Sequence, residues 1–427
     1  MTPDDTKIAI IGGDVYAPAY QSESNIFIRG NKIDSIGTES FDASEYQSAT
    51  VVNAADCIVI PGLIDTLVHG GGGADTLFSN AKDLEKTARA HAAQGVTSIV
   101  LTISSASMEQ INHALDAVGY LVNNPVEGGA RILGSYVEGK FGSREKRGAQ
   151  NLEYICSPNF EDFHAMWAAS DGTIKIISIA PEDDDGLKFT KHLATYSEET
   201  YNNITVAMGH TNATYDQAMA AIDAGITRAT HTFNGMSGMH HRNLGAVEAI
   251  FKHPKIHAEI IVDGIHVNPI WAKTLIMWKG IDGVGLVTDS TASAGISKEE
   301  WIQHSVYEPD LDAYRLDWEK LSAGSNLNYF IKNRAVWINL GERDARLYGG
   351  MITLMEGLRN VVSWGYSLEE AVAMATLTPA KSLKLDNQKG SIAPGKDADL
   401  VILDAELNPK AVMIEGKFVK NELASQW

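Results

Sequence analysis

Hydrophobic and polar positions alternate with two different periods along the chain. Residues 7–60 form short apolar segments separated by Gly, Asn and Asp at hairpin spacing, which predicts a small antiparallel β unit. After residue 61, short β-branched runs alternate with stretches of helical periodicity. Because parallel strands need crossover helices, this alternation predicts a parallel sheet. Seven or eight such repeats indicate an α/β fold of the (β/α)8, TIM-like barrel type.

The two ends of the chain resemble each other in pattern. Residues 385–427 return to short strands with turns, so we expect residues 1–60 and 385–427 to build one small β-sandwich domain. The barrel domain would then span residues 61–384. Residues 298–346 mix aromatic and charged residues and fit neither period, which predicts a long loop insertion with short helices.

Composition and charge narrow the class of protein. The 427 residues carry 35 Lys and Arg against 54 Asp and Glu, a net charge of −19, which argues against a nucleic-acid partner. No apolar run reaches the roughly 18 residues of a membrane span, and the N-terminus lacks the pattern of a secretory signal. Cys57 and Cys156 cannot make a disulfide framework. We therefore expect a cytoplasmic protein with no membrane partner.

Polar residues follow the predicted strands directly, at the end of a barrel where active sites lie. These residues are Asp65, His69, Glu138, Glu182, His210, His231, Asp263, His266 and Asp289. One carboxylate and two imidazoles, Glu138, His210 and His231, match the three-ligand, open-position pattern of a catalytic divalent metal. Such a metal lowers the pKa of a bound water and makes a nucleophile near neutral pH.

Several short motifs occur together and in a particular order. They include PGLIDTLVHGGGGADT, VEGKF, GHTNAT, THTFNGM, DGIHV, VTDST and GSIAPGKDADLVILD. This series resembles the N-acetylglucosamine-6-phosphate deacetylases of the amidohydrolase superfamily, over nearly the whole chain. The resemblance implies a distorted barrel with a small β-domain, a homodimer, and hydrolysis of the acetamide of an amino-sugar phosphate.

The resemblance also implies roles for individual residues. Glu138, His210 and His231 correspond to the metal ligands, holding one divalent metal per chain, with zinc favoured and iron, manganese, cobalt or nickel as alternatives. Asp289 corresponds to the catalytic carboxylate. The implied substrate contacts are Asn234, Gly235, the phosphate-binding Arg242, and His266, which is expected to reach across the dimer interface.

The chain departs from the family pattern at a few positions. Leu67 stands where two-metal amidohydrolases have a His, so we expect His69 to form hydrogen bonds and not to hold a second metal. Lys140 replaces a Pro, and Gln150 replaces a His that holds the substrate carbonyl, a role the Gln amide could take over. With His69 and His241, Lys140 is expected to support the site from behind the ligands.

These departures leave the identity of the substrate sugar open. N-acetylgalactosamine 6-phosphate or another N-acyl amino sugar is an alternative substrate, and a catalytically weakened sugar-phosphate-binding paralogue is an alternative function. The intact Glu138, His210, His231 and Asp289 speak against the paralogue. Arg242 and His266 speak against a third reading, a cyclic-amide hydrolase of the same superfamily.

Overall fold

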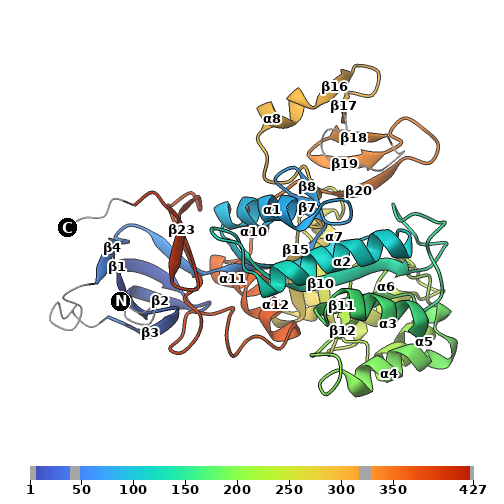
Figure 1. Ribbon diagram of the computed structural model, residues 1–427, viewed down its shortest axis with the longest axis horizontal. Coiled ribbons are helices and arrows are strands. Elements are labelled where there is room, and N and C mark those ends of the chain that lie inside the picture. The colour runs from blue at the N-terminus through green and yellow to red at the C-terminus, as the bar shows by residue number, and fades with distance from the viewer. Residues whose placement is uncertain (1–5, 39–48, 317–327, 424–427) are drawn as a thin grey trace.

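An eight-stranded parallel barrel forms the centre of the molecule (Figure 1). The computed structural model describes residues 6–38, 49–316 and 328–423. A bridge between Val68 and Ser290 joins the first and last barrel strands. The strands, in chain and spatial order, are β6 (Leu63–Val68), β9 (Val96–Ile103), β10 (Arg131–Phe141), β11 (Ile174–Ile179), β12 (Thr205–Met208), β13 (Arg228–Ala229), β14 (His257–Ile261) and β15 (Val284–Val287). The predicted fold class is confirmed.

Helices connect these strands and cover the outside of the barrel (Figure 1). Most begin at a Ser, Thr or Asn whose side chain accepts a backbone N–H, as Ser107 and Thr214 do in full capping boxes. The helices are α1 (Ala81–Ala93), α2 (Met108–Asn123), α3 (Phe160–Ala169), α4 (Lys188–Tyr196), α5 (Tyr215–Asp223), α6 (Ala246–Lys252), α7 (Pro269–Lys279), α10 (Leu354–Ser363), α11 (Leu368–Ala375) and α12 (Leu377–Ser382). Their apolar faces pack on strands that are buried on both sides, which explains the continuous apolar runs of the strands.

Both ends of the chain enter one second sheet, at the left of Figure 1. Strand β21 (Leu400–Leu403) pairs antiparallel with β5 (Ile58–Pro61), so residues more than 300 apart in sequence become neighbours. The other strands are β1 (Lys7–Tyr16), β2 (Tyr20–Arg29), β3 (Lys32–Gly37), β4 (Thr50–Asn53), β22 (Pro409–Ile414) and β23 (Lys417–Asn421). This domain has its own apolar core. The ends of the predicted domain, residues 1–5 and 424–427, lie outside the described residues.

The described residues of the predicted long loop at 298–346 form a small antiparallel sheet, so this expectation was wrong for them; residues 317–327 of the predicted loop lie outside the described residues. After α8 (Lys298–Gln303) come β16 (Ser305–Glu308), β17 (Ala313–Leu316), β18 (Tyr329–Lys332), β19 (Ala335–Ile338) and β20 (Arg346–Gly350). Most of these strands have four residues, too few for a clear alternating pattern. They fold because Leu316, Tyr329, Ile331, Val336 and Ile338 share a buried cluster. The insertion sheet stands above the barrel in Figure 1.

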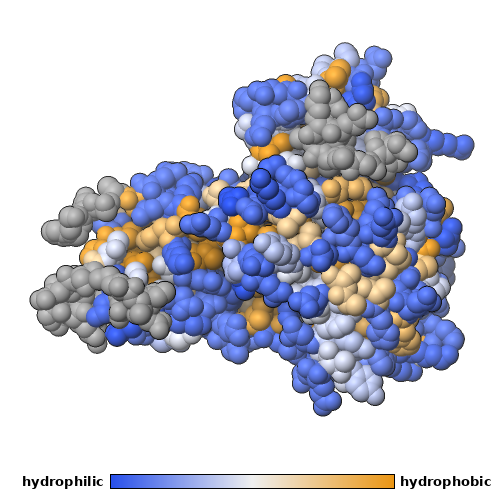
Figure 2. Space-filling view, in the orientation of Figure 1, coloured by the Kyte–Doolittle hydropathy of each residue, from blue (hydrophilic) through white to orange (hydrophobic). Residues whose placement is uncertain are grey.

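Shorter elements complete the chain. Strands β7 (Gly70–Gly71) and β8 (Ala74–Asp75) form a hairpin after β6, and single 3-10 turns occur at η2 (Pro181–Asp183), η3 (Asp185–Leu187) and η4 (Ile281–Gly283). The face drawn in Figure 2 is largely hydrophilic, with smaller apolar areas between the polar groups. Within the described ranges, no helix has the length and hydrophobicity needed to cross a bilayer.

Candidate metal centre and active site

A cavity of about 700 Å³ opens at the carboxyl ends of the barrel strands. It brings together most of the residues that the sequence singles out, although they come from separate strands and loops. The predicted site residues in its wall are His69, Glu138, Gln150, His210, His231, Asn234, Gly235, His266 and Asp289. A pocket of this size suits a phosphorylated monosaccharide.

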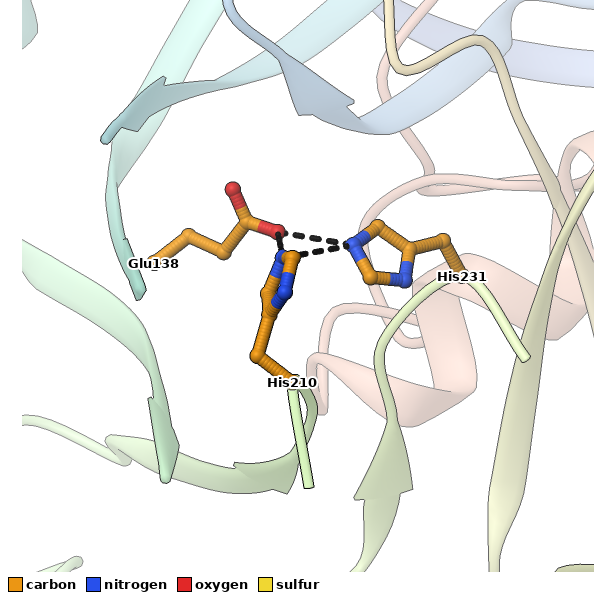
Figure 3. A group of neighbouring side chains, drawn as sticks. All are labelled: Glu138, His210 and His231. Atoms are coloured by element: carbon orange, nitrogen blue, oxygen red, sulfur yellow. Dashed lines mark hydrogen bonds and ion pairs between the residues drawn. The ribbon is translucent and has the colours of Figure 1, made fainter. Parts of the chain in front are cut away.

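Glu138, His210 and His231 converge on one point in this cavity (Figure 3). Oε1 of Glu138 lies 2.9 Å from Nε2 of His210 and 2.8 Å from Nε2 of His231. The two Nε2 atoms are 3.3 Å apart. Glu138 belongs to β10, while each His follows its own short strand by two residues. All three side chains are buried.

The donor atoms fit a divalent metal. Nδ1 of His210 lies 2.9 Å from the backbone oxygen of Lys146, and because that oxygen can only accept, Nδ1 carries the proton. This leaves Nε2 as the nitrogen that can bind a metal, and Nε2 points toward Glu138 and His231. A separation of about 3.3 Å is also what two imidazole nitrogens have when both bind a tetrahedral ion at about 2.05 Å.

The backbone at the site adopts a conformation that non-glycine residues rarely take. His210, His231 and Asp289 have φ values of 45°, 28° and 50°, in the left-handed region. Such strain persists only where the surroundings impose it, and it concentrates at functional sites. Each of the three follows a barrel strand, so the left-handed turn aims its side chain into the cavity.

Gly235 leaves room for this arrangement. A Cβ at Gly235 would lie 2.7 Å from Nδ1 of His210 and 3.0 Å from the backbone oxygen of Lys146. Any side chain there would separate these two groups and turn the imidazole. The φ of Gly235, 57°, also favours glycine.

His69 connects the ligand group to Asp289. Its Nε2 lies 3.1 Å from Oε2 of Glu138 and 3.3 Å from Oδ1 of Asp289, and its Nδ1 lies 3.1 Å from the hydroxyl of Ser104. Leu67 points instead into the barrel interior, where it packs against Val100 and its neighbours. Leu67, which stands at the first His position of a two-metal site, is therefore part of the apolar core.

Negative charge dominates the electrostatics of this group. Burial alone would lower the pKa of His69, but its hydrogen bonds with Asp289 and Glu138 raise the pKa to about 10. His231 responds in the same way to Glu138, and its pKa rises to about 9. Burial opposes ionisation of Glu138, yet the surrounding imidazoles hold its pKa well below the usual range. The buried carboxylates therefore stabilise positive charge at this point.

Gln150 lies in the cavity wall, and its side-chain amide is hydrogen-bonded to the metal-ligand candidate Glu138. Its Nε2 donates to Oε2 of Glu138 at 2.9 Å, and its Oε1 accepts the backbone N–H of Ser105 at 2.8 Å. Gln150 is buried. These contacts hold the Glu138 carboxylate in place from behind.

Three predicted residues lie away from the cavity wall. Arg242 and His241 are exposed and contact each other, Nη1 to Nε2 at 2.7 Å. Lys140 is buried and pairs with Asp162 of α3 at 3.2 Å, so it faces away from the ligands and does not support them as expected.

His266 lies in the wall of its own chain's cavity, with Nδ1 2.6 Å from Oδ2 of Asp263. The expectation that it reaches across a dimer interface stays a prediction. Glu182, another residue at a strand end, accepts from the hydroxyl of Thr211 and the N–H of Asn212 outside the ligand group.

Two arginines in the cavity wall were missed by the sequence reasoning. Arg147 follows β10, and Arg346 begins β20 of the insertion sheet. Neither directly follows a barrel strand, so the rule that active-site residues lie at strand ends does not point to them. Recognising 298–346 as a sheet that returns to the barrel beside Asp289 would have pointed to Arg346.

Comparison with known proteins gives a consistent result. Residues 58–419 match the model of the amidohydrolase family. An N-acetylglucosamine-6-phosphate deacetylase of Vibrio furnissii is 30% identical over 392 residues, which cover 91% of this chain and 90% of that protein. An N-acetylgalactosamine-6-phosphate deacetylase of Escherichia coli O157:H7 is 31% identical over 361 residues, covering 84% and 87%.

The fold comparison agrees with the sequence comparison. A mutant N-acetyl-D-glucosamine-6-phosphate deacetylase from Mycobacterium smegmatis, solved in complex with N-acetyl-D-glucosamine-6-phosphate, is similar with a TM-score of 0.83 and 26% identity. The match covers 97% of this chain and 100% of that one. The chain therefore belongs to the amidohydrolase family and, within it, to the N-acetylglucosamine-6-phosphate deacetylase family.

Proposed function

We propose that this protein is a metal-dependent deacetylase that hydrolyses the acetamide of an N-acetylated hexosamine 6-phosphate, giving the amino-sugar phosphate and acetate. The observation that carries the proposal is the convergence of Glu138, His210, His231 and Asp289 in one cavity. N-acetylglucosamine 6-phosphate is the first candidate substrate. The 31% identity to the Escherichia coli galactosamine enzyme makes N-acetylgalactosamine 6-phosphate the second.

Glu138, His210 and His231 would hold the metal, for which zinc suits the mixed carboxylate and imidazole set. A divalent metal bound there supplies Lewis acidity and lowers the pKa of a water molecule. Asp289 accepts the proton of the attacking water and returns it to the departing amine, so one carboxylate serves as base and then as acid. His69, 3.3 Å from Asp289, keeps that carboxylate directed toward the ligand group.

Asn234 and Gly235 are positioned to contact the sugar from the segment that follows His231. The side-chain Nδ2 of Asn234 donates to the backbone oxygen of His231 at 3.2 Å, which leaves its Oδ1 available to a sugar hydroxyl. Because Gly235 has no side chain, the cavity wall beside His210 leaves room there. This segment therefore links the ligand geometry to the position of the substrate.

We also propose a homodimer. Helix α7, which follows His266 closely, exposes Ile270, Trp271, Met277 and Trp278, with exposed fractions of 71, 45, 72 and 64%. Large apolar side chains gathered on one helix are typical of a surface covered in the assembly. The two free cysteines are compatible with the reducing cytoplasm, where we place the enzyme.

The test combines metal analysis with product release. Purified protein is assayed for bound metal and for acetate release from N-acetylglucosamine 6-phosphate, its galactosamine epimer and the unphosphorylated sugars. We expect one metal per chain, loss of activity on chelation and recovery on adding zinc. His210→Gln should lose metal and activity, whereas His113→Gln, an exposed His on α2, should retain both.

Two results would contradict the proposal. Two tightly held metals per chain would show that the site is not the single one argued from Glu138, His210 and His231. Metal-loaded protein that binds these sugar phosphates but releases no acetate would establish the weakened, sugar-phosphate-binding paralogue instead.

A further inference from the structure

Two arginines share the cavity wall with the metal-ligand group. Arg147 lies on the segment after β10, three residues before Gln150, and Arg346 is the first residue of β20. Both are partly buried, and the side chain of Arg346 is 28% exposed. They reach the cavity from different parts of the chain, one from the barrel and one from the insertion sheet.

The position of Arg346 is fixed by the barrel itself. Four residues further along β20, the N–H of Gly350 donates to the backbone oxygen of Asp289 at 2.8 Å, and the N–H of Thr291 donates to the oxygen of Gly350 at 3.0 Å. Because a strand rises about 3.3 Å per residue, Arg346 lies within about 13 Å of this attachment point. The insertion sheet therefore carries its guanidinium to the mouth of the cavity.

The positive charge of this pair is only partly neutralised by the protein. Nη1 of Arg147 donates to the backbone oxygen of Gln150 at 3.2 Å, and no carboxylate of the described chain lies within ion-pair distance of it. Nη2 of Arg346 lies 4.0 Å from Oδ2 of Asp344, which is itself half exposed and accepts from Asn339. The two guanidinium groups therefore share one nearby carboxylate, Asp344, which lies at the limit of ion-pair distance from Arg346.

The two cations also act on each other. Burial and the nearby Arg346 lower the pKa of the Arg147 guanidinium, and Asp344 only partly compensates. Two like charges in one cavity wall repel each other, and an anion bound between them would relieve this repulsion. Guanidinium groups bind the planar edge of a carboxylate or phosphate through two parallel hydrogen bonds.

We propose that Arg147 and Arg346 form a subsite for an oxyanion of the substrate, in the same cavity as the metal-ligand group. The inference rests on the proposed deacetylase function and specifies the substrate further. The resemblance assigns the phosphate to Arg242, which is exposed and outside this chain's cavity, whereas Arg147 and Arg346 line that cavity from within the chain. The oxyanion is the 6-phosphate of the sugar or a carboxylate on the acyl group, and both are bound by the same chemistry.

Arg346→Gln is the central variant because Arg346 makes few contacts, and Arg147→Gln is the second. Arg346→Lys keeps the positive charge but cannot form two parallel hydrogen bonds to one anion. Arg343→Gln is the matched control, since Arg343 is an exposed arginine of the same segment outside the cavity. Melting temperature and bound metal verify that each variant is folded and loaded.

Three substrates separate the sources of the anion: an N-acetylhexosamine 6-phosphate, its unphosphorylated form, and a hexosamine with an N-acyl group ending in a carboxylate. We expect Arg346→Gln to raise KM for one anionic substrate about 10- to 100-fold, with kcat and the neutral substrate changed less than about threefold. The KM of Arg346→Lys for that anionic substrate should lie between the values of wild type and Arg346→Gln. A KM effect confined to the phosphate or to the carboxylate identifies the anion.

Equal KM effects on neutral and anionic substrates, or none on either anionic substrate in both Gln variants, would overturn the subsite. Failure of the deacetylase function is recognised separately, because it abolishes acetate release in the wild type. In that case, calorimetric binding of glucosamine 6-phosphate and of the carboxylate-bearing N-acyl hexosamine, each compared with its neutral form, still tests the arginines. A preference for either anion that is lost in Arg346→Gln but retained in Arg343→Gln supports the subsite, and unchanged preferences for both anions refute it.

Discussion

Replacing Gln150 by Met separates two roles that this residue could have. Met has a similar length but neither donates nor accepts a strong hydrogen bond, so the change removes the contacts with Glu138 and Ser105 while leaving the volume filled. If Gln150 positions Glu138, metal affinity should fall. If Gln150 instead binds the acetamide carbonyl, as the family pattern suggested, the metal should stay and kcat should fall.

The structure gives the expected size of the effect. Oε2 of Glu138 accepts from Gln150 at 2.9 Å and lies 3.1 Å from His69, so the substitution removes one of its two close polar partners. Loss of a contact that orients a metal ligand lowers metal affinity about 10- to 100-fold. The buried N–H of Ser105 also loses its acceptor, which costs about 1–3 kcal/mol of stability.

The assay is competition for zinc against a chelator of known affinity, with kcat measured at saturating metal. Gln303→Met, at an exposed position on α8, controls for the substitution itself. We expect Gln150→Met to weaken zinc binding and to recover most of its kcat when zinc is in excess. Zinc affinity within threefold of wild type, together with a large loss of kcat, would refute the positioning role.

The sequence was sufficient to predict that Glu138, His210 and His231 cluster, because the barrel imposes a simple rule. Side chains that follow parallel strands meet at one end of the barrel, so Glu138, His210 and His231 could be placed together without knowing any distance. Hydrophobic periodicity supplied the strands themselves. The left-handed backbone at His210 and His231 could not be foreseen, since neither residue type requires it.

Lys140 shows where the strand rule fails. It lies two residues after Glu138 on β10, so regular alternation would place both side chains on the same face. Gly139, with a φ of 79°, and a register shift between Val137 and Phe141 interrupt the alternation. Lys140 therefore turns toward Asp162, and its position could be known only from the structure.

The insertion sheet was missed for a different reason. Its strands have four or five residues and are separated in the sequence by charged residues, so no window holds enough alternation to be recognised. Its stability comes from pairing between strands and from a shared buried cluster, neither of which is visible along the sequence. Arg346 is brought to the cavity by this non-local pairing, and so it escaped the sequence reasoning together with the sheet.

Three further substitutions test the site and the barrel. Asp289→Asn should lower kcat by about 10²- to 10⁴-fold without loss of metal, measured by acetate release and metal analysis, because the role proposed for Asp289 is proton transfer and not metal binding. Gly235→Ala should reduce metal content, since its Cβ would lie 2.7 Å from His210; metal content equal to wild type would contradict this. Asp65→Asn tests a buried acid below the site. Burial raises the pKa of Asp65 to about 7, although hydrogen bonds from Thr288 oppose the shift. Between about pH 4 and 7, Asp65 is ionised in the unfolded chain but stays protonated in the native protein. The stability that protonated Asp65 contributes at low pH is therefore lost as pH rises. The free energy of unfolding falls by up to about 1.4 kcal/mol per pH unit. The melting temperature of wild type relative to Asp65→Asn, both free of metal, should therefore fall from pH 4.5 to 7. Other carboxylates titrate in both proteins and cancel in this difference, so parallel curves would show that Asp65 is ionised in the native barrel.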